Sequence, residues 1–250
     1  MLREERLRFI LQKLQQQHRV TSKALSEELS VSDDTIRRDL NELAEGGHLK
    51  KVHGGAVPKP ATPLAYAERI DFAHAGKRRL AEKSLPFFED GMVIILDDGT
   101  TNLMLAKMLP FELKATIFTN GLHIAEALLE HPGVELILLG GKVRKQERSI
   151  IDPEVVHMLE NVRADLCSIG ASGVHHKIGV SATYRDELYT KRKMVEVSDK
   201  NIMLATNDKV NTARNYVVCK YPSLDALIVE DDIKPEILVD YLDQGVEVIL

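Results

Sequence analysis

A short polar segment near the N-terminus carries side chains that suit contacts with DNA. Ser32 can cap a helix by accepting backbone N–H bonds, so a helix is predicted to begin there. Thr35, Arg37 and Arg38 lie off its apolar face, near the start of the helix. Hydroxyl and guanidinium groups on such a helix can enter a major groove, where Arg reads guanine edges and grips phosphates. We therefore expect these four residues to contact double-stranded DNA.

Four Gly-rich or polar turns between residues 97 and 173 could bind an anion. They follow predicted strands, and some open a helix, whose free N–H groups and positive dipole end favour phosphate. One such turn alone has a structural explanation, because strand-to-helix turns need Gly, but several at one sheet edge indicate a ligand site. Gly170-Ala171-Ser172-Gly173 is one of the four turns. The expected ligand-binding residues of the other three are Asp97, Gly99, Thr100, Thr101, Thr119, Asn120, Gly140, Gly141 and Lys142.

Glu187 and Lys191 lie four residues apart on a predicted helix and can pair across one turn. One interpretation is a surface ion pair. The other is that Lys191 neutralises a ligand phosphate while an acid holds sugar hydroxyls. In the second case the phosphate lies at Gly99-Thr100-Thr101, with Lys142 or Lys191 supplying positive charge, and Asp97 meets a sugar hydroxyl.

Three helices are predicted to position the DNA-contacting residues. Apolar residues recur at helical spacing in residues 7–14, 24–29 and 36–43. Thr21 and Ser32 are the expected N-caps, and Val31 fills the tight connection between the second and third helices. Gly46 and Gly47 are expected to end the third helix with a positive φ.

A basic wing is predicted after the third helix. Residues 49–53 alternate like a strand and Gly54-Gly55 makes a turn, which places Lys50, Lys51 and His53 toward the DNA backbone. The alternative is a small three-helix domain for protein contacts, with its arginines merely solvated. The N-cap, the apolar residue in the connection, the arginine pair and the basic wing all agree with a DNA-binding domain, which favours that interpretation.

Three prolines in residues 58–63 mark a domain boundary, because they make an extended connector. We expect a winged helix-turn-helix domain in 1–57, a Pro-rich linker in 58–63 and a second domain in 64–250. The second domain alternates short apolar strands with amphipathic helices, which indicates an α/β fold with a mostly parallel sheet and helices on both faces. The predicted strands are 92–97, 115–119, 134–139, 165–170, 201–205, 226–229 and 246–250. The predicted helices are 101–108, 122–129, 153–161, 185–198 and 235–242.

The formal net charge of the 250 residues is −5, which by itself argues against nucleic-acid binding. The charge is divided unevenly. Residues 1–60 hold 11 Lys and Arg against 9 Asp and Glu, or +2, and the remainder holds 22 against 29, or −7. A module this mildly basic needs well-placed charges and two copies rather than a strong field.

The two cysteines, Cys167 and Cys219, lie in apolar runs and are expected to be buried thiols. No Cys spacing indicates a metal site, and we expect no metal or other cofactor. The N-terminus lacks the apolar region of a signal peptide, and no apolar run approaches the ~20 residues that span a bilayer. The expected protein is cytoplasmic, without membrane contact.

The N-terminal pattern resembles the winged helix-turn-helix of the DeoR family of bacterial repressors. The matching residues are Val31-Ser32, Thr35 to Leu40, Leu43, Gly47, Leu49 and His53 to Ala56. The resemblance implies that Thr35, Arg37 and Arg38 enter the groove. Asp39 is expected to support these arginines, because a carboxylate facing phosphate would repel it.

The rest of the chain is similar to the C-terminal domain of that family, which in turn is similar to sugar-phosphate isomerases of the ribose-phosphate type. The matching residues are Lys77-Arg78, Asp97, Gly99 to Thr101, Thr119-Asn120, Leu139 to Gly141, Gly170, Glu187, Lys191-Arg192 and Met194. The resemblance implies a phosphorylated sugar or related metabolite as inducer, and self-association as a dimer or tetramer.

Two positions depart from the family pattern. Ser172 stands where many members have Asp, which removes an obvious general base from its loop. Asn207-Asp208-Lys209 stands where the family often has Ser-Ser-Lys, which leaves the identity of the ligand open, with Lys209 as a candidate phosphate partner.

The sequence therefore predicts a DNA-binding transcriptional regulator without catalytic residues: a repressor of a carbohydrate-metabolism operon, released by a phosphorylated sugar. A sugar-phosphate isomerase is the enzyme alternative, and it needs a base beside a C–H next to a carbonyl. Its candidate bases are Asp97, Asp98, Asp186 and Glu187. A third alternative is a constitutive DNA-binding protein whose second domain only dimerises, which predicts no thermal shift with ligand.

Overall fold

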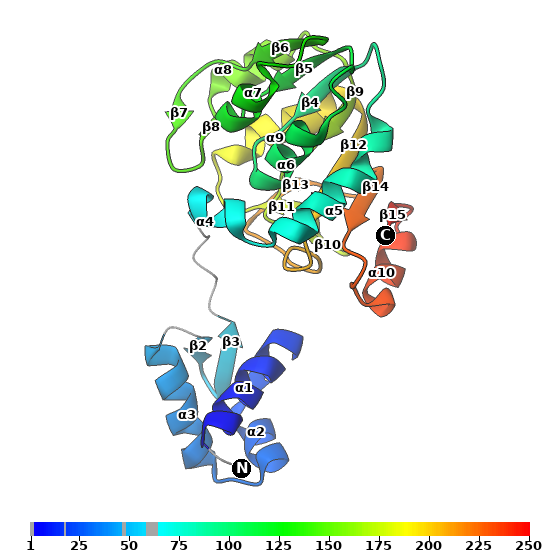
Figure 1. Ribbon diagram of the computed structural model, residues 1–250. Helices are drawn as coiled ribbons and strands as arrows, with labels where there is room; N and C mark the ends of the chain where they lie inside the picture. The colour runs from blue at the N-terminus through cyan, green and yellow to red at the C-terminus, as the bar shows by residue number, and fades with distance from the viewer. Residues whose placement is uncertain (1–2, 18, 47–48, 59–64) are drawn as a thin grey trace. The chain divides into compact units, whose positions relative to one another are not determined.

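The computed structural model describes residues 3–17, 19–46, 49–58 and 65–250. The chain forms two compact units, Met1–Leu64 and Ala65–Leu250 (Figure 1). The predicted linker, apart from Pro58, lies outside the described residues, so its structure and the domain boundaries stay predictions.

The first unit is a three-helix bundle with a small antiparallel sheet. Its helices are α1 (Arg3–Gln17), α2 (Ser22–Leu29) and α3 (Asp33–Glu45). Its strands, β1 (Val20–Thr21), β2 (Leu49–Val52) and β3 (Gly55–Pro58), pair in the order β1-β3-β2. Apolar residues from all three helices meet in one buried cluster that includes Ile10, Leu25, Ile36 and Leu40. The fold is the predicted winged helix-turn-helix.

Two of the three predicted helix ends in this unit are confirmed, namely the N-caps of α2 and α3. Thr21 caps α2 by accepting the N–H of Ala24 at 3.2 Å, and Ser32 caps α3. The expectation of a positive φ after α3 is wrong for Gly46, whose φ is −68°, because its N–H continues the helical pattern by bonding back to Glu42. Gly47 lies outside the described residues.

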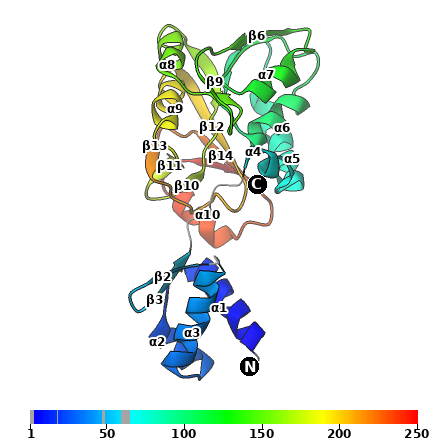
Figure 2. The same ribbon diagram turned by 90° about the vertical axis from the view of Figure 1, so that its left-hand side faces the viewer.

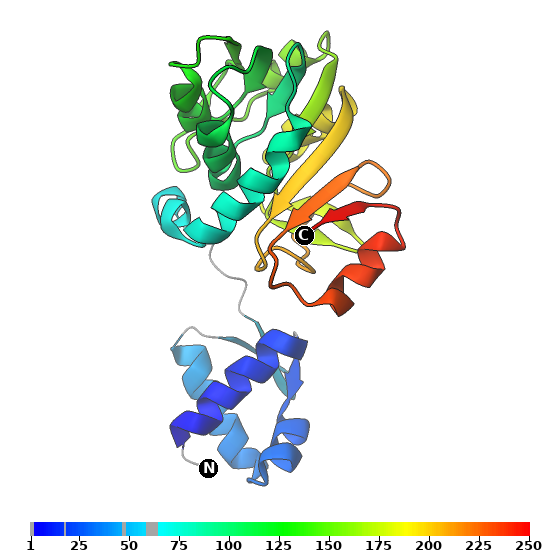
Figure 3. The ribbon, with the colours of Figure 1, turned by 45° about the vertical axis from the view of Figure 1, so that its right-hand side comes forward.

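A seven-stranded sheet forms the centre of the second unit, and all its neighbouring strands are parallel. In spatial order the strands are β15 (Glu247–Ile249), β14 (Ala226–Val229), β12 (Ser198–Ala205), β9 (Ala164–Ser168), β4 (Val93–Leu96), β5 (Ala115–Thr119) and β6 (Val134–Leu138). Each of the seven predicted strands is present. Figure 3 shows β15 at the edge of the sheet, beside β14.

Helices cover both faces of this sheet (Figure 2). One face packs against α5 (His74–Ser84), α6 (Thr100–Met108) and α7 (Leu122–Leu128). The other packs against α8 (Pro153–Leu159), α9 (Glu187–Glu196) and α10 (Pro235–Leu242). Successive strand residues alternate between the two cores, as Ile94 and Ile95 do in β4, because side chains of a strand point to opposite faces. The predicted α/β architecture is confirmed.

The shorter elements of this unit were not predicted. The helices are α4 (Tyr66–Asp71) and the 3-10 turn η1 (Leu85–Phe87), and α5 was also missed. β7 (Val143–Arg144) and β8 (Ser149–Ile150) form a hairpin. β10 (Gly173–His175), β11 (Gly179–Ala182) and β13 (Tyr216–Cys219) form a separate sheet, antiparallel in both its pairings.

The order of the strands reverses between β4 and β9. From β4 the chain proceeds outward to β5 and β6, and it then returns to the other side of β4 for β9, β12 and β14. The connections after β4 and β9 run on opposite faces of the sheet. In sheets of this kind, ligands bind at the carboxyl ends of the two strands where the order reverses.

Candidate functional sites

The carboxyl ends of β4 and β9 bring together a buried polar cluster. Asp97 and Asp98 follow β4 directly, and both are buried, Asp97 completely. Asp97 Oδ2 accepts the backbone N–H of Gly170 at 2.8 Å, and Oδ1 accepts that of Asp98 at 2.9 Å. A Cβ at Gly170 would lie 2.2 Å from the carbonyl oxygen of Asp98, so only Gly fits. These contacts join the ends of two neighbouring strands.

Lys191 of α9 neutralises this pair of carboxylates. Its Nζ lies 2.5 Å from Asp97 Oδ2 and 2.9 Å from Asp98 Oδ1, and the residue is 4% exposed. Burial opposes the charge of both Lys191 and Asp98. The carboxylates nevertheless raise the pKa of Lys191, and its ammonium holds the pKa of Asp98 below the ordinary value. The surface ion pair with Glu187, one interpretation of the sequence, is wrong because Lys191 is buried.

The N-terminus of α6 lies directly beyond this cluster. Gly99, with a φ of +127°, leads into the helix, and the N–H groups of a first helical turn have no partners within the helix. Thr100 is half-buried and Thr101 is 6% exposed. The Thr101 hydroxyl has no hydrogen-bond partner among the described residues, although buried hydroxyls are normally bonded.

Asn102 and Ser168 hold the ends of β4 and β9 in place. The Asn102 amide donates to the carbonyl oxygens of Asp97 and Ser168, both at 2.8 Å, and its oxygen accepts the Ser168 hydroxyl at 2.8 Å. The sequence prediction omitted both residues. The available signal was a polar side chain inside an otherwise apolar strand and at the first turn of a helix.

Thr119 and Asn120, at the end of β5, are buried and belong to the same framework. Asn120 Oδ1 accepts the N–H of Asp98 at 2.9 Å, and Thr119 Oγ1 accepts that of Gly121 at 3.1 Å. These two predicted ligand-binding residues therefore shape the loops.

The predicted residues Gly140, Gly141 and Lys142 follow β6. Gly141 has a φ of +132°, and a Cβ there would lie 2.7 Å from the Cβ of Asp152. Lys142 donates its backbone N–H to Asp152 at 3.1 Å, while its side chain is exposed. The structure thus leaves this ammonium accessible to an anion.

Glu187 of α9 pairs with Arg144 of β7. The guanidinium Nη1 lies 3.1 Å from Glu187 Oε1 and 3.2 Å from Asp186 Oδ1. Burial raises the pKa of Glu187 to about 7, although Lys191 opposes this shift. The β7–β8 hairpin is thereby tied to the start of α9.

Residues of α4 and α5 form further connections to this region. Tyr66 stacks on His123 of α7 with ring centroids 5.3 Å apart, and Arg69 Nη2 lies 2.5 Å from Glu147 Oε2. The buried Lys77 donates to the backbone carbonyl of Arg69. The sequence prediction placed no element here, because α4 is short and α5 has few apolar residues.

In the first unit, α3 carries the predicted DNA-contacting residues. The Ser32 hydroxyl accepts the N–H of Thr35 at 3.2 Å and lies 2.8 Å from the Thr35 hydroxyl. Arg37 and Arg38 are exposed, and Arg37 Nε lies 3.0 Å from Asp33 Oδ2. Arg38 projects from the side of α3 opposite its buried residues.

Asp39 does not support these arginines. It is 3% exposed and accepts two bonds from Arg6 of α1, of which the Nη2–Oδ1 bond measures 2.9 Å. The expectation failed because Asp39 falls on the inner side of α3, where it joins α1 to α3.

The wing lysines lie on β2, and their side chains point to different faces of the strand. Lys51 Nζ donates to Asn41 of α3 at 2.6 Å, while Lys50 points to the opposite face of β2. Both are exposed, as is His53 in the turn that follows.

Two family models match the chain. The model described as DeoR-like helix-turn-helix domain matches residues 6–59, and the one described as DeoR C terminal sensor domain matches residues 73–231. The chain belongs to the DeoR family. Its two units are therefore the DNA-binding and sensor domains of a DeoR-family transcriptional regulator, as the sequence predicted.

Curated relatives of this DeoR-family chain resemble it over most of its length. The HTH-type transcriptional repressor GlcR of Bacillus subtilis is 31% identical, covering 100% of this chain and 97% of that protein. The glycerol-3-phosphate regulon repressor of Escherichia coli is 32% identical, covering 84% and 82%. Among solved structures, a ribose 5-phosphate isomerase from Methanocaldococcus jannaschii covers 55% of this chain and 54% of its own at 14% identity, with a TM-score of 0.40.

Two further features are absent from the described residues. None of their helices is long and apolar enough to cross a membrane. No three His, Cys, Asp or Glu side chains among them gather as they would around a metal ion.

Proposed function

We propose that this DeoR-family regulator is a repressor of a carbohydrate-metabolism operon and that a phosphorylated sugar or related metabolite releases it from DNA. The names of the relatives support the role, since two of them are repressors and one concerns a glycerol phosphate. The observation that carries the ligand assignment is the buried, unpartnered Thr101 hydroxyl at the start of α6.

The phosphate takes backbone N–H bonds from Gly99, Thr100 and Thr101 together with the threonine hydroxyls, because a helix N-terminus favours an anion. Lys191 is unsuited to meet the phosphate directly, since Asp97 and Asp98 already bind its ammonium. Its part is to hold the strand end in position. The exposed Lys142 remains a candidate for contact with the ligand.

Asp97 cannot take a sugar hydroxyl without breaking existing contacts. Both its oxygens are engaged, and the side chain is fully buried. The same engagement makes Asp97 a poor general base, which disfavours an isomerase. We therefore propose binding without turnover.

The first unit binds operator DNA through α3, with Arg38 reading bases and Lys50 contacting the backbone. A net charge of only +2 in residues 1–60 gives a weak single contact. We therefore propose a dimer or tetramer whose DNA-binding units engage repeated half-sites together. The effector acts by binding the DNA-competent and DNA-incompetent states unequally.

Calorimetric titration of the full chain tests the ligand assignment. Glycerol 3-phosphate and sugar phosphates are compared with their dephosphorylated forms, and each phosphate is also incubated for turnover. We expect a phosphorylated member to bind much more tightly than its free partner. Thr101→Val should weaken that binding, and Thr116→Val, a change in β5 away from the turn, should not. Tighter binding of a free sugar overturns the phosphate site, and product formation overturns the non-enzymatic assignment.

A further inference from the structure

Lys77 of α5 is a buried ammonium without an ion pair among the described residues. It is 4% exposed, and the one acceptor that the structure gives it is the neutral carbonyl of Arg69. Burial lowers its pKa to about 8, and nearby Lys209 adds to this effect. A buried charge normally has a partner of opposite sign. An anion is therefore the missing component.

Lys209 is a second cation near Lys77, and it is half-buried. It lies in the loop that follows β12, where its N–H bonds to Thr206 at 2.8 Å and its carbonyl accepts the N–H of Val174 at 3.0 Å. Burial lowers its pKa, against the attraction of Asp208. The charges of Arg69 and Lys191 also lower the pKa of Lys209, so Lys209 lies close enough to the polar cluster to interact with it electrostatically.

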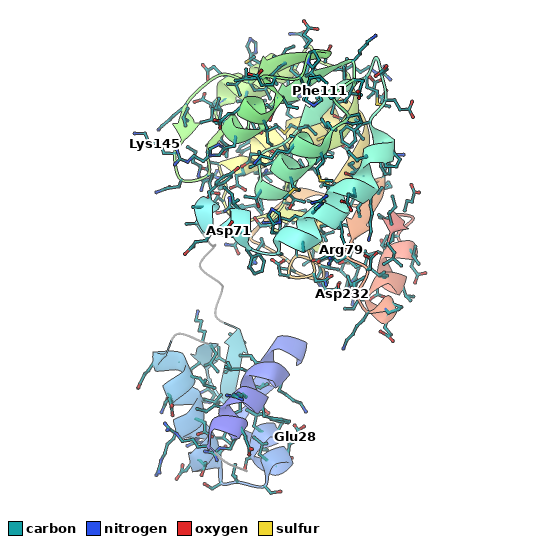
Figure 4. The ribbon with its side chains drawn as sticks, viewed as in Figure 1. Glu28, Asp71, Arg79, Phe111, Lys145 and Asp232 are labelled. Carbon is teal, nitrogen blue, oxygen red and sulfur yellow. The ribbon has the colours of Figure 1, made fainter. Side chains whose placement is uncertain are left out.

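The start of α5 lies against the ends of β12 and β14, which brings the two lysines to one place. A Cβ at Gly76 would lie 2.2 Å from Glu230 Oε2, directly after β14. Glu230 Oε1 accepts the N–H of Asn207, two residues before Lys209, at 3.0 Å. Arg79, marked on α5 in Figure 4, approaches the same Glu230 at 3.4 Å.

Carboxylates occur nearby but do not neutralise the pair. Asp71 and Asp208 attract Lys77, yet neither forms an ion pair with it. Asp71 is exposed at the end of α4 (Figure 4). Glu230 already accepts the Asn207 N–H and pairs with Arg79.

The sheet gives the spacing of the two strand ends that lead to Lys209 and to the proposed phosphate position. β12 lies two strands from β4. Neighbouring strands are about 4.8 Å apart, so the two strand ends are about 10 Å apart. A sugar chain with an acidic group at each end spans a distance of this order.

We infer that Lys77 and Lys209 form a second anion subsite, and that the effector is a phosphorylated sugar or sugar acid with a second acidic group at its other end. This inference rests on the proposed function, which places the first phosphate at α6. The subsite selects against sugar phosphates with a single acidic group, because they leave both ammonium groups without a counter-ion.

Paired ligands test the inference in calorimetric titrations of the full chain. The pairs are glucose 6-phosphate with 6-phosphogluconate, fructose 6-phosphate with fructose 1,6-bisphosphate, and glycerol 3-phosphate with 3-phosphoglycerate. We expect the doubly acidic member of at least one pair to bind about tenfold or more tightly than its partner, the gain of charge-assisted hydrogen bonds.

Lys77→Met and Lys209→Met should each remove that gain and leave unchanged the affinity for the member with one acidic group. Lys107→Met, which removes an exposed charge at the far end of α6, is the matched control and should change neither. Thermal unfolding of each variant shows that it is folded. Because Lys209 is less deeply buried, its variant remains informative if Lys77→Met unfolds.

The possible failures are distinguishable. If phosphates with one acidic group bind and the second acidic group adds nothing, the subsite is wrong and the phosphate site stands. If the lysine variants lose both members of a pair equally, the lysines belong to the first site and the inference is wrong. If no phosphate binds, the proposed effector class fails, and the subsite fails with it.

Discussion

Lys191 shows how one side chain can support a site without meeting the ligand. Its ammonium lies between two buried carboxylates from the end of β4, and those carboxylates also receive backbone N–H bonds. Removal of the ammonium leaves Asp97 and Asp98 buried without a counter-charge, which is far more costly than the loss of a surface ion pair.

We therefore expect Lys191→Met to destabilise the sensor domain by about 3–5 kcal/mol. Urea unfolding of the full chain measures the change. Lys142→Met, which removes an exposed lysine in a neighbouring loop, is the control and should leave unfolding almost unchanged. Equal stability of both variants would show that the carboxylates do not depend on Lys191.

Lys77 gives a pH dependence with a defined sign. Burial, with help from Lys209, lowers its pKa to about 8 from the ordinary 10.5. A lysine that binds protons less well when folded destabilises the folded state while it is charged. This penalty is complete below the folded pKa and fades as the pH rises toward the unfolded value. Lys77→Met should accordingly be more stable than the wild type at pH 7, and the difference should shrink by pH 10. Unfolding temperatures at four pH values test this, and a constant difference would contradict it.

The recognition helix α3 divides its basic residues by role. Arg38 projects from the face opposite the core, whereas Arg37 is held by Asp33. Arg38→Ala should weaken operator binding by roughly 1–3 kcal/mol and relax the preference for one base. Lys50→Ala should weaken binding to all DNA sequences about equally. It should also reduce, by about one, the slope of the logarithm of the binding constant against the logarithm of the salt concentration. Gel-shift titrations at several salt concentrations separate the two effects, with Lys107→Ala as control. If Arg38→Ala binds operator like the wild type, α3 does not read bases.

Long elements with a clear period were predictable, and short ones were not. α1 was predictable because apolar residues recur at helical spacing in residues 7–14, and the central parallel strands were found because they are short apolar runs buried on both faces. β10 and β11 have three and four residues, too few to show alternation. The candidate site was likewise predictable only where its residues are close together in the sequence. The glycine turns are local, whereas the Lys191 pairing spans more than ninety residues and depends on the order of strands.

At the scale of the whole molecule, the two units have separate cores, so the DNA-binding unit should fold without the sensor domain. A fragment of residues 1–60 should bind an operator with two half-sites about 10²–10⁴-fold more weakly than the full chain, because it lacks the second linked copy. Fluorescence anisotropy at one salt concentration measures both affinities. On a duplex with a single half-site the two proteins should bind alike. Equal affinity on the complete operator would contradict the proposed assembly.

The helix α4 is the first described element after the linker, and its length has a mechanical consequence. Six residues are too few for a helix to persist in water, so α4 depends on its anchors, the Tyr66–His123 stack and the Arg69–Glu147 ion pair. Six helical residues span about 9 Å and six extended residues about 20 Å. Loss of these anchors would lengthen the tether to the DNA-binding unit by about 11 Å. The reach of that tether is thus set by two side-chain contacts on the sensor domain.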